Sequence, residues 1–155
     1  MIIPIIKQVP PECIGGKILY CSEQGTFFSA KGRELKPHFN SAMRNKSYTH
    51  GGAYPTMANF ANRLCHHLVF ETFVGPRAKG LEIDHINGDK MNWSLSNLQE
   101  VTPAENRKRA KILRILRSNG LDPKQMTRAE LLAIFNKYTF VDPEIIDKYE
   151  PLKHI

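Results

Sequence analysis

The spacing of apolar residues in the first part of the chain predicts short β-strands. Between residues 17 and 36, short apolar runs are broken by Gln24-Gly25 and by Lys31-Gly32, which is typical of a β-hairpin or meander. Residues 1–15 carry three prolines and no amphipathic period, so we expect an arm or an edge strand there. The pattern of residues 38–63 favours no single kind of secondary structure.

Helical and extended patterns follow one another in the middle of the chain. Apolar residues within 64–74 recur as on one face of a helix, and Gly75-Pro76 ends it. Residues 81–86 alternate in polarity as a short strand does, and residues 98–101 give a second short strand. This order predicts a helix followed by two strands.

The last third of the chain is predicted to be helical. Thr102-Pro-Ala-Glu105 has the form of a capping box, so a helix is expected to begin at Pro103 and to end at Asn119-Gly120. Thr127-Arg-Ala-Glu130 starts a second helix, and Asp142-Pro143 caps a third. The regular apolar spacing of these later helices favours packing, with a small DNA-binding appendage as the alternative.

Composition places the chain among ordinary globular proteins. With 155 residues, of which 41% are hydrophobic and 24% charged, it is long enough for one domain or a small core with appended modules. No apolar run approaches the roughly 20 residues that span a bilayer, and the start lacks a basic leader and a cleavage site. We therefore expect a cytoplasmic protein, in a bacterial or phage-infected cell, without a membrane partner.

The cysteines fit a reducing compartment, because three of them form no disulfide framework. Cys13, Cys21, Cys65 and His66 have the side-chain chemistry of zinc ligands, but the usual short spacing within a ligand pair is missing. Ordinary buried thiols are the favoured interpretation.

Charge is segregated along the chain. The net charge of +7 favours a polyanionic partner. Residues 64–105 carry a net charge of −3, whereas residues 1–63 carry +5 and residues 106–119 carry +6. An acidic centre between basic flanks is typical of a cation site within a phosphate-binding surface.

Two basic groups are candidate contacts to DNA phosphates. Lys31, Arg33 and Lys36 lie at and beside a predicted turn, where they would contact phosphates or form a solvated hairpin tip. The helix from Pro103 has an apolar face and an opposite basic face that includes Arg107, Lys111, Arg114 and Arg117. The absence of acidic residues in 106–119 favours DNA contact, chiefly through the first three, over a solvated face.

The stretch 81–106 holds the candidate chemistry. Hydrolysis of a phosphodiester needs an activated water, stabilisation of charge on the phosphate and help for the leaving oxygen. His85 suits the general base, because imidazole titrates near neutral pH. A divalent cation bound by Asp84 and the side-chain oxygen of Asn106 would supply the rest. Mg²⁺ prefers such oxygen ligands, with Mn²⁺ or another divalent ion as alternatives.

Three further residues are candidates for supporting roles. Asn97 would tie the ends of its loop together and hold His85 in place, or would be a simple turn asparagine, and Asn92 shares either role. His66 lies beside the apolar face of the helix predicted in 64–74. It is either a packed residue or a support for the site.

Four segments together resemble one known family. They are His66-His-Leu-Val, Ile83-Asp-His-Ile-Asn-Gly-Asp-Lys, Asn97-Leu-Gln-Glu-Val-Thr and Glu105-Asn106. The chain is similar to the HNH endonucleases over roughly residues 17–110, particularly to the free-standing phage and homing type. Its pattern departs in two places, because His67 stands where arginine is usual and Asn106 stands where histidine is usual.

The resemblance implies an α+β protein built on a ββα-metal (His-Me finger) nuclease core. By motif match, it implies His85 as general base, Asp84 and Asn106 as metal ligands, and Asn97 as the orienting residue. We expect a β-rich, basic, DNA-contacting module in residues 1–63, the HNH core in 64–110 and a helical extension in 111–155.

The sequence thus predicts a Mg²⁺-dependent endonuclease or nickase that acts on double-stranded DNA without a small-molecule cofactor. A single site cuts one strand at a time, so a monomer would nick unless it rebinds or forms a weak dimer. The alternative is an auxiliary DNA-binding protein, in phage packaging or regulation, that retains the fold without cleaving. A zinc-held structural module is disfavoured by the ligand types present.

Overall fold

The computed structural model describes residues 3–39, 54–142 and 144–146. The chain divides into two compact units. Unit 1 contains Met1–Arg77 and Lys90–Leu98, and unit 2 contains Ala78–Asp89 and Gln99–Ile155. Each unit is therefore assembled from separate stretches of sequence. The division into three modules, residues 1–63, 64–110 and 111–155, stays a prediction.

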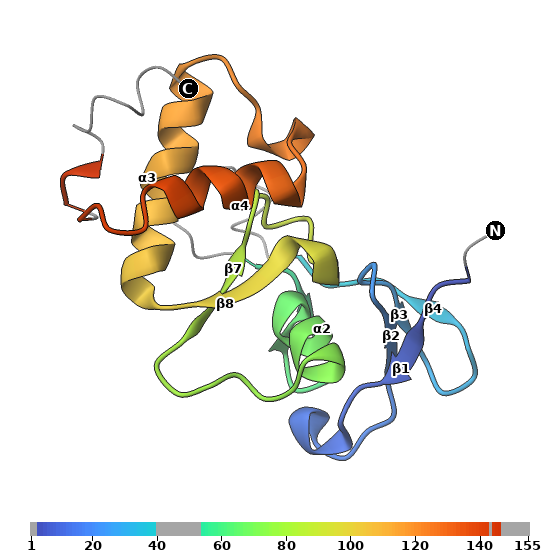
Figure 1. Ribbon diagram of the computed structural model, residues 1–155. Helices are drawn as coiled ribbons and strands as arrows, with labels where there is room; N and C mark the ends of the chain where they lie inside the picture. Colours follow the sequence, from blue (N-terminus) through green and yellow to red (C-terminus); the bar gives the residue numbers. More distant parts are fainter. Residues whose placement is uncertain (1–2, 40–53, 143, 147–155) are drawn as a thin grey trace. The chain divides into compact units, whose positions relative to one another are not determined.

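Unit 1 begins with a four-stranded antiparallel meander in the order β1-β2-β3-β4 (Figure 1). The strands are β1 (Ile6–Gln8), β2 (Tyr20–Ser22), β3 (Phe27–Phe28) and β4 (Glu34–Leu35). Cys21 pairs with Lys7 on one side and with Phe27 on the other, and both Cys21 and Phe27 are fully buried. The predicted meander and edge strand are confirmed.

The meander is followed in unit 1 by a small hairpin and a helix. The elements are β5 (Thr56–Met57), β6 (Arg63–Leu64) and α2 (Cys65–Phe73), with 3-10 turns η1 (Pro11–Ile14) and η2 (Leu95–Asn97). Helix α2 buries Leu68, Val69 and Phe70 in the core, as its apolar spacing predicts. The hairpin β5-β6 lies in the stretch whose structure the pattern left open.

A close contact between distant residues attaches the segment 90–98 to the rest of unit 1. The Trp93 Nε1 donates to the Gly25 carbonyl oxygen at 2.7 Å, and the Leu95 nitrogen donates to the Glu23 oxygen at 2.7 Å. Gly25 has a φ of +87°, and a Cβ there would lie 2.4 Å from Trp93 Cδ1. Only glycine combines this conformation with this approach.

Unit 2 contains two paired strands followed by helices, which continue the strand-strand-helix order expected from the sequence. They are β7 (Glu82–His85), β8 (Leu98–Val101), α3 (Pro103–Ser118), the 3-10 turn η3 (Pro123–Gln125) and α4 (Arg128–Lys137). The α+β composition agrees with the prediction. The ββα-metal core stays a prediction.

The helices of unit 2 begin where their capping residues predict. The Thr102 side chain accepts from the Glu105 nitrogen, with Pro103 in the first turn, and Thr127 and Glu130 form a reciprocal capping box. The Glu105 carboxylate lies near Lys108 and Arg109 instead of completing the first box. The third predicted helix, from Pro143, falls largely outside the described residues.

Helix α4 crosses α3 in unit 2 (Figure 1), and the two share an apolar core. The buried members are Ile86, Ile112, Leu113, Leu116, Leu131, Ile134, Phe135, Tyr138 and Ile146. The later helical segment therefore packs, as its spacing favours. No helix in the described part of the chain has the length and apolar character needed to cross a membrane.

Candidate active site

Strand β7 directs its acidic side chains toward α3. Alternation along a strand places Glu82 and Asp84 on one face and His85 on the other. Glu82 and Asp84 both contact residues of α3, as described below, and Asp84 and His85 are only 9% and 5% exposed. The acidic face of β7 and the first turns of α3 therefore form one polar cluster inside unit 2.

Asn106 is fixed by a hydrogen bond to this strand. Its Nδ2 donates to Glu82 Oε2 at 2.6 Å. Because an amide presents its donor and its acceptor on different atoms, this bond commits the nitrogen to Glu82 and leaves the side-chain oxygen as the atom suited to a cation.

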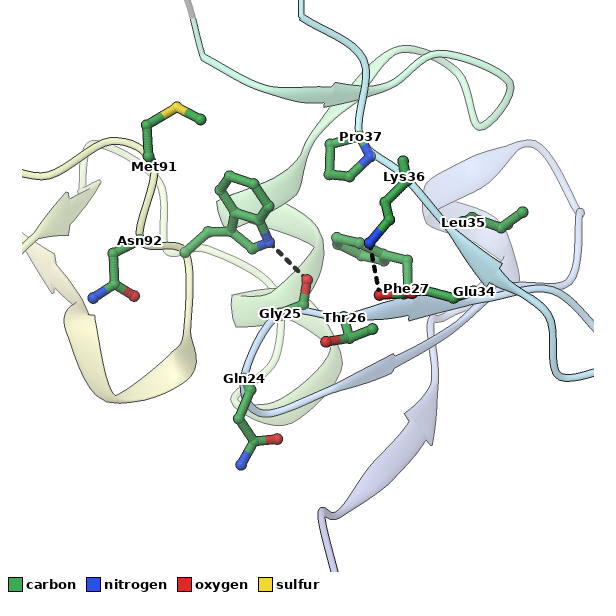
Figure 2. A pocket seen from close by; sticks show the side chains of 11 residues that line it. Gln24, Gly25, Thr26, Phe27, Glu34, Leu35, Lys36, Pro37, Met91 and Asn92 are labelled. Carbon is green, nitrogen blue, oxygen red and sulfur yellow. Dashed lines mark hydrogen bonds and ion pairs between the residues drawn. The ribbon is translucent and has the colours of Figure 1, made fainter.

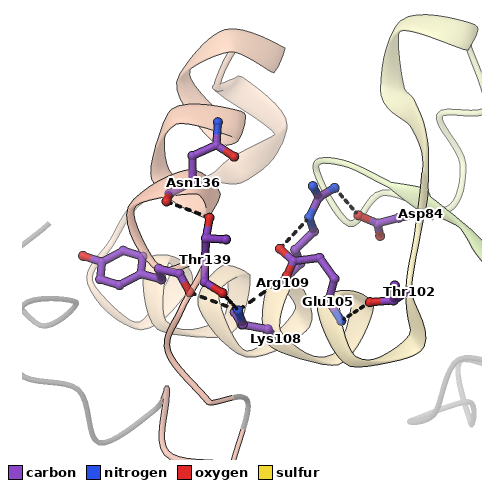
Figure 3. Close-up of polar contacts among 8 residues, drawn as sticks. Asp84, Thr102, Glu105, Lys108, Arg109, Asn136 and Thr139 are labelled. Carbon is purple, nitrogen blue, oxygen red and sulfur yellow. Dashed lines mark hydrogen bonds and ion pairs between the residues drawn. The ribbon is translucent and has the colours of Figure 1, made fainter.

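Asp84 is paired with an arginine of the same unit. Arg109 Nη1 lies 3.1 Å from Asp84 Oδ2, and Arg109 Nε lies 3.5 Å from Glu105 Oε1 (Figure 3). Burial raises the pKa of Asp84 to about 6, although the charge and hydrogen bond of Arg109 act in the opposite direction and the charges of Glu105 and Glu82 add to the rise. A further cation beside Asp84 would favour the ionised form of this carboxylate.

Arg109 was not among the residues singled out from the sequence. It lies three positions before Ile112 and seven before Leu116, so the apolar period of α3 extends back to it. An arginine at such a position is only 6% exposed here. One feature of the sequence points to Arg109. It is a basic residue at a core position of the helix, four residues after the acidic residue Glu105.

The oxygen donors around β7 and α3 suit a hard cation. Among the described residues, no group of three or more His, Cys, Asp and Glu side chains is placed to hold a metal ion. A site made from Asp84 and the amide oxygen of Asn106 is thin, and Mg²⁺ accepts such sites because it keeps several waters. The donor chemistry therefore fits Mg²⁺.

The cysteines are packed thiols, as favoured from the sequence. Cys21 and Cys65 are buried, and burial raises their pKa values to about 11 and about 12. Neutral thiols are poor ligands. With Cys13 and His66, they form no metal cluster within the described residues, so the zinc alternative has no support.

His66 belongs to α2 in unit 1 and packs among rings. Its ring centroid lies 4.9 Å from that of Tyr54 and 4.4 Å from that of His67. Burial, with the nearby charges of Arg77 and Arg63, lowers the pKa of His67 to about 4. These ring contacts are those of a packed residue. A supporting role of His66 in the site stays a prediction.

Asn97 and Asn92 stabilise one loop of unit 1. The Asn97 Nδ2 donates to the Asn92 carbonyl oxygen at 2.9 Å, and Asn92 Oδ1 accepts from Ser94 Oγ at 2.6 Å. Asn97 thus ties the ends of the loop together. Its action on His85, which belongs to unit 2, stays a prediction.

The basic residues singled out as DNA contacts are mostly on the surface. Lys31, Arg33 and Lys36 are exposed, and Lys36 pairs with Glu34 at 3.1 Å. On α3, Arg107 and Arg114 are exposed and Lys111 is half-buried. The basic run of 106–119 is not a uniform surface, because Lys108 and Arg109 are buried.

Unit 1 also has a pocket of about 280 Å³ beside its meander (Figure 2). Residues of the β2–β4 region line it together with Met91, Asn92 and Trp93. The Lys36–Glu34 ion pair lies within this lining. These residues do not form a set with which to catalyse phosphodiester hydrolysis.

The central part of the chain is similar in sequence to a known family. Residues 63–108 match the sequence model of a family described as HNH endonuclease. We call residues 63–108 the HNH segment, after the family model that they match. The HNH segment contains β7, η2, β8 and the start of α3, and therefore Asp84, His85, Asn97 and Asn106.

One curated protein is also similar to part of the chain. The chain is 44% identical over 45 residues to the protein of Bacillus subtilis (strain 168) named "SPbeta prophage-derived putative HNH homing endonuclease YosQ". The matched region is 29% of this chain and 26% of that protein, so the chain spans about a quarter of the relative's length. No solved structure matches the chain significantly.

Proposed function

We propose that the protein is a metal-dependent HNH endonuclease that hydrolyses phosphodiester bonds in double-stranded DNA, one strand at a time. The single observation that carries this proposal is the polar cluster of unit 2. There, Arg109 holds Asp84 and Glu82 holds Asn106, and Glu82, Asp84 and Asn106 lie inside the stretch that matches the HNH family model.

His85 is the proposed general base. It would accept a proton from a water molecule as the water oxygen forms a bond to phosphorus, and the bond from phosphorus to the leaving sugar oxygen would break. The His85 backbone is held at the end of β7, where its carbonyl oxygen accepts from the Gly88 nitrogen at 2.7 Å. Asn97 is the proposed orienting residue for its ring.

Asp84 and Asn106 are the proposed ligands of Mg²⁺ or a similar divalent ion. When bound, the ion would stabilise negative charge on the phosphate and on the leaving oxygen. Arg107, Lys111 and Arg114 on α3, with Lys31, Arg33 and Lys36 of the meander, would contact DNA phosphates. Such contacts position the duplex without reading its sequence.

The test incubates supercoiled plasmid with the full chain, with and without Mg²⁺, beside His85→Ala and Asp84→Asn. We expect nicked circles only with wild type and Mg²⁺, and a loss of at least about 100-fold in rate for each variant. Lys137→Met, which removes an exposed charge from α4, is the control and should nick like wild type. Cleavage that persists in EDTA would exclude the metal proposal.

The Arg109–Asp84 ion pair also admits an alternative, a DNA-binding protein without cleavage, if the arginine takes the place of the cation beside the proposed ligand. A gel shift of plasmid by both wild type and His85→Ala, without nicking by either, would support that function.

A further inference from the structure

We propose that Arg109 is a positioning residue for the metal ligand Asp84, and that helix α4 supports it through the ring of Phe135. This inference rests on the proposed function. It concerns how the chain's own residues hold the carboxylate that a divalent cation would bind.

Arg109 has contacts on three sides, all within unit 2. Its Nη1 lies 3.1 Å from Asp84 Oδ2 and its Nε lies 3.5 Å from Glu105 Oε1 (Figure 3). Its Cζ lies 4.7 Å from the centroid of the Phe135 ring, which comes from α4 and is fully buried. The guanidinium is therefore held by a helix neighbour, by a strand residue and by an aromatic face.

This arrangement orients the carboxylate and still allows it to bind a cation. The contact of Arg109 is with one oxygen of Asp84, Oδ2, and a carboxylate has a second oxygen with its own lone pairs. A planar guanidinium with fixed donor directions defines the plane of its partner better than a flexible ammonium. Arg109 would thus fix Asp84 while Oδ1 serves the metal ion.

A second buried cation attaches α4 to the helix that carries Arg109. Lys108 Nζ donates to the carbonyl oxygens of Tyr138 and Thr139 at 3.0 and 2.8 Å, and lies 3.4 Å from Glu105 Oε2 (Figure 3). These carbonyls are at the C-terminal end of α4, where a cation interacts favourably with the helix dipole. Two adjacent residues of α3 therefore contact α4. Arg109 contacts the Phe135 ring, and Lys108 contacts the carbonyl oxygens at the end of the helix.

A purely structural ion pair would affect folding without changing metal affinity in the folded protein. A positioning residue predicts more, because partners of metal ligands typically change metal affinity by about 10- to 100-fold when they are substituted. Metal affinity therefore separates the two roles.

The experiment measures Mn²⁺ and Mg²⁺ binding to the full chain by calorimetry, for wild type, Arg109→Lys and Phe135→Leu. We expect Arg109→Lys to bind the ion about 10-fold or more weakly, and Phe135→Leu to show a smaller loss in the same direction. Lys137→Met removes an exposed charge from α4 and should keep the wild-type affinity. Circular dichroism in EDTA selects the variants that are folded.

Nicking at increasing Mg²⁺ provides the second measurement. For a positioning role, Arg109→Lys needs more Mg²⁺ but approaches the wild-type rate at saturation, whereas His85→Ala stays inactive at every concentration. A folded Arg109→Lys with the wild-type metal affinity would overturn the inference while leaving the nuclease proposal intact. A wild type that binds metal through Asp84 but never nicks would overturn the nuclease proposal alone. If Arg109→Lys does not fold, Phe135→Leu decides by the same measurement.

Discussion

Replacing Gly25 by alanine tests whether the contact with Trp93 attaches the segment 90–98 to the meander of unit 1. The new Cβ would lie 2.4 Å from Trp93 Cδ1 and 2.6 Å from Trp93 Nε1, so the indole must move. Moving it breaks the 2.7 Å hydrogen bond to the Gly25 oxygen. The residue would also keep a φ of +87°, which side chains rarely adopt.

The magnitude follows from these separate costs. The positive φ costs about 1 kcal/mol, the lost hydrogen bond about 1 kcal/mol and the repacking of the indole about 1–2 kcal/mol. We expect Gly25→Ala to lower the free energy of unfolding by about 3–4 kcal/mol in total. Gly32→Ala is the matched control, because Gly32 has a φ of +82° and a Cβ added there would meet no atom within 4 Å. Gly32→Ala should lower the free energy of unfolding by only about 1 kcal/mol.

The assay is urea unfolding followed by tryptophan fluorescence. Trp93 is the one tryptophan of the sequence, so the emission reports directly on this contact. We expect Gly25→Ala to shift the emission of the folded protein toward that of exposed indole and to unfold at lower urea. Equal midpoints for Gly25→Ala and Gly32→Ala, with unchanged emission, would refute the reasoning.

Three further predictions concern buried groups. Because the pKa of His67 is about 4 when folded and about 6.5 when unfolded, the unfolded chain binds more protons below pH 6.5. Stability should therefore fall from pH 7 to 5 by about 1 kcal/mol after solvent screening, and melting temperatures of wild type and His67→Asn at both pH values check this; equal pH dependence would contradict it. Cys21 and Cys65, with raised pKa values, should react with iodoacetamide at pH 8 far more slowly than half-exposed Cys13. Mass spectrometry measures the rates, and three equal rates would be inconsistent with the buried thiols. Lys108→Met removes the cationic donor to two carbonyl oxygens, of which that of Tyr138 keeps the Val141 nitrogen at 3.1 Å, and should lower the free energy of unfolding by about 1–3 kcal/mol; thermal unfolding measures it, and a wild-type melting temperature would rule it out.

Local chemistry made much of the fold predictable from the sequence. The turn residues at Gln24-Gly25 and the caps at Thr102 and Thr127 act through neighbours a few positions away, and the structure contains the strands and helices they predict. The motif of the HNH segment likewise identified Asp84 and Asn106 as residues of one strand and one following helix.

The contacts that the sequence could not predict join residues far apart in the chain. Arg109 and Asp84 are 25 positions apart, and Trp93 and Gly25 are 68 positions apart. A charged residue on an apolar helix face is predicted to be exposed unless its partner is known, because burying an unpaired charge costs much free energy. The burial of Lys108 is unpredictable for the same reason. Its acceptors are carbonyl oxygens that come within reach only when α4 ends beside α3.

The interleaving of the two units constrains how the protein can be made and recombined. During synthesis, unit 1 lacks its Trp93 contact until residues 90–98 have emerged, although the first residues of unit 2, from Ala78, are made earlier. Domains usually fold as units, and N-terminal ones first. Here unit 1 cannot finish folding before part of unit 2 has been synthesised, because its second stretch, residues 90–98, follows the first stretch of unit 2. A cassette cut at residues 63 and 108 would remove parts of both cores. Exchange of the HNH segment between proteins should therefore succeed only when the meander and the helices α3 and α4 are transferred with it.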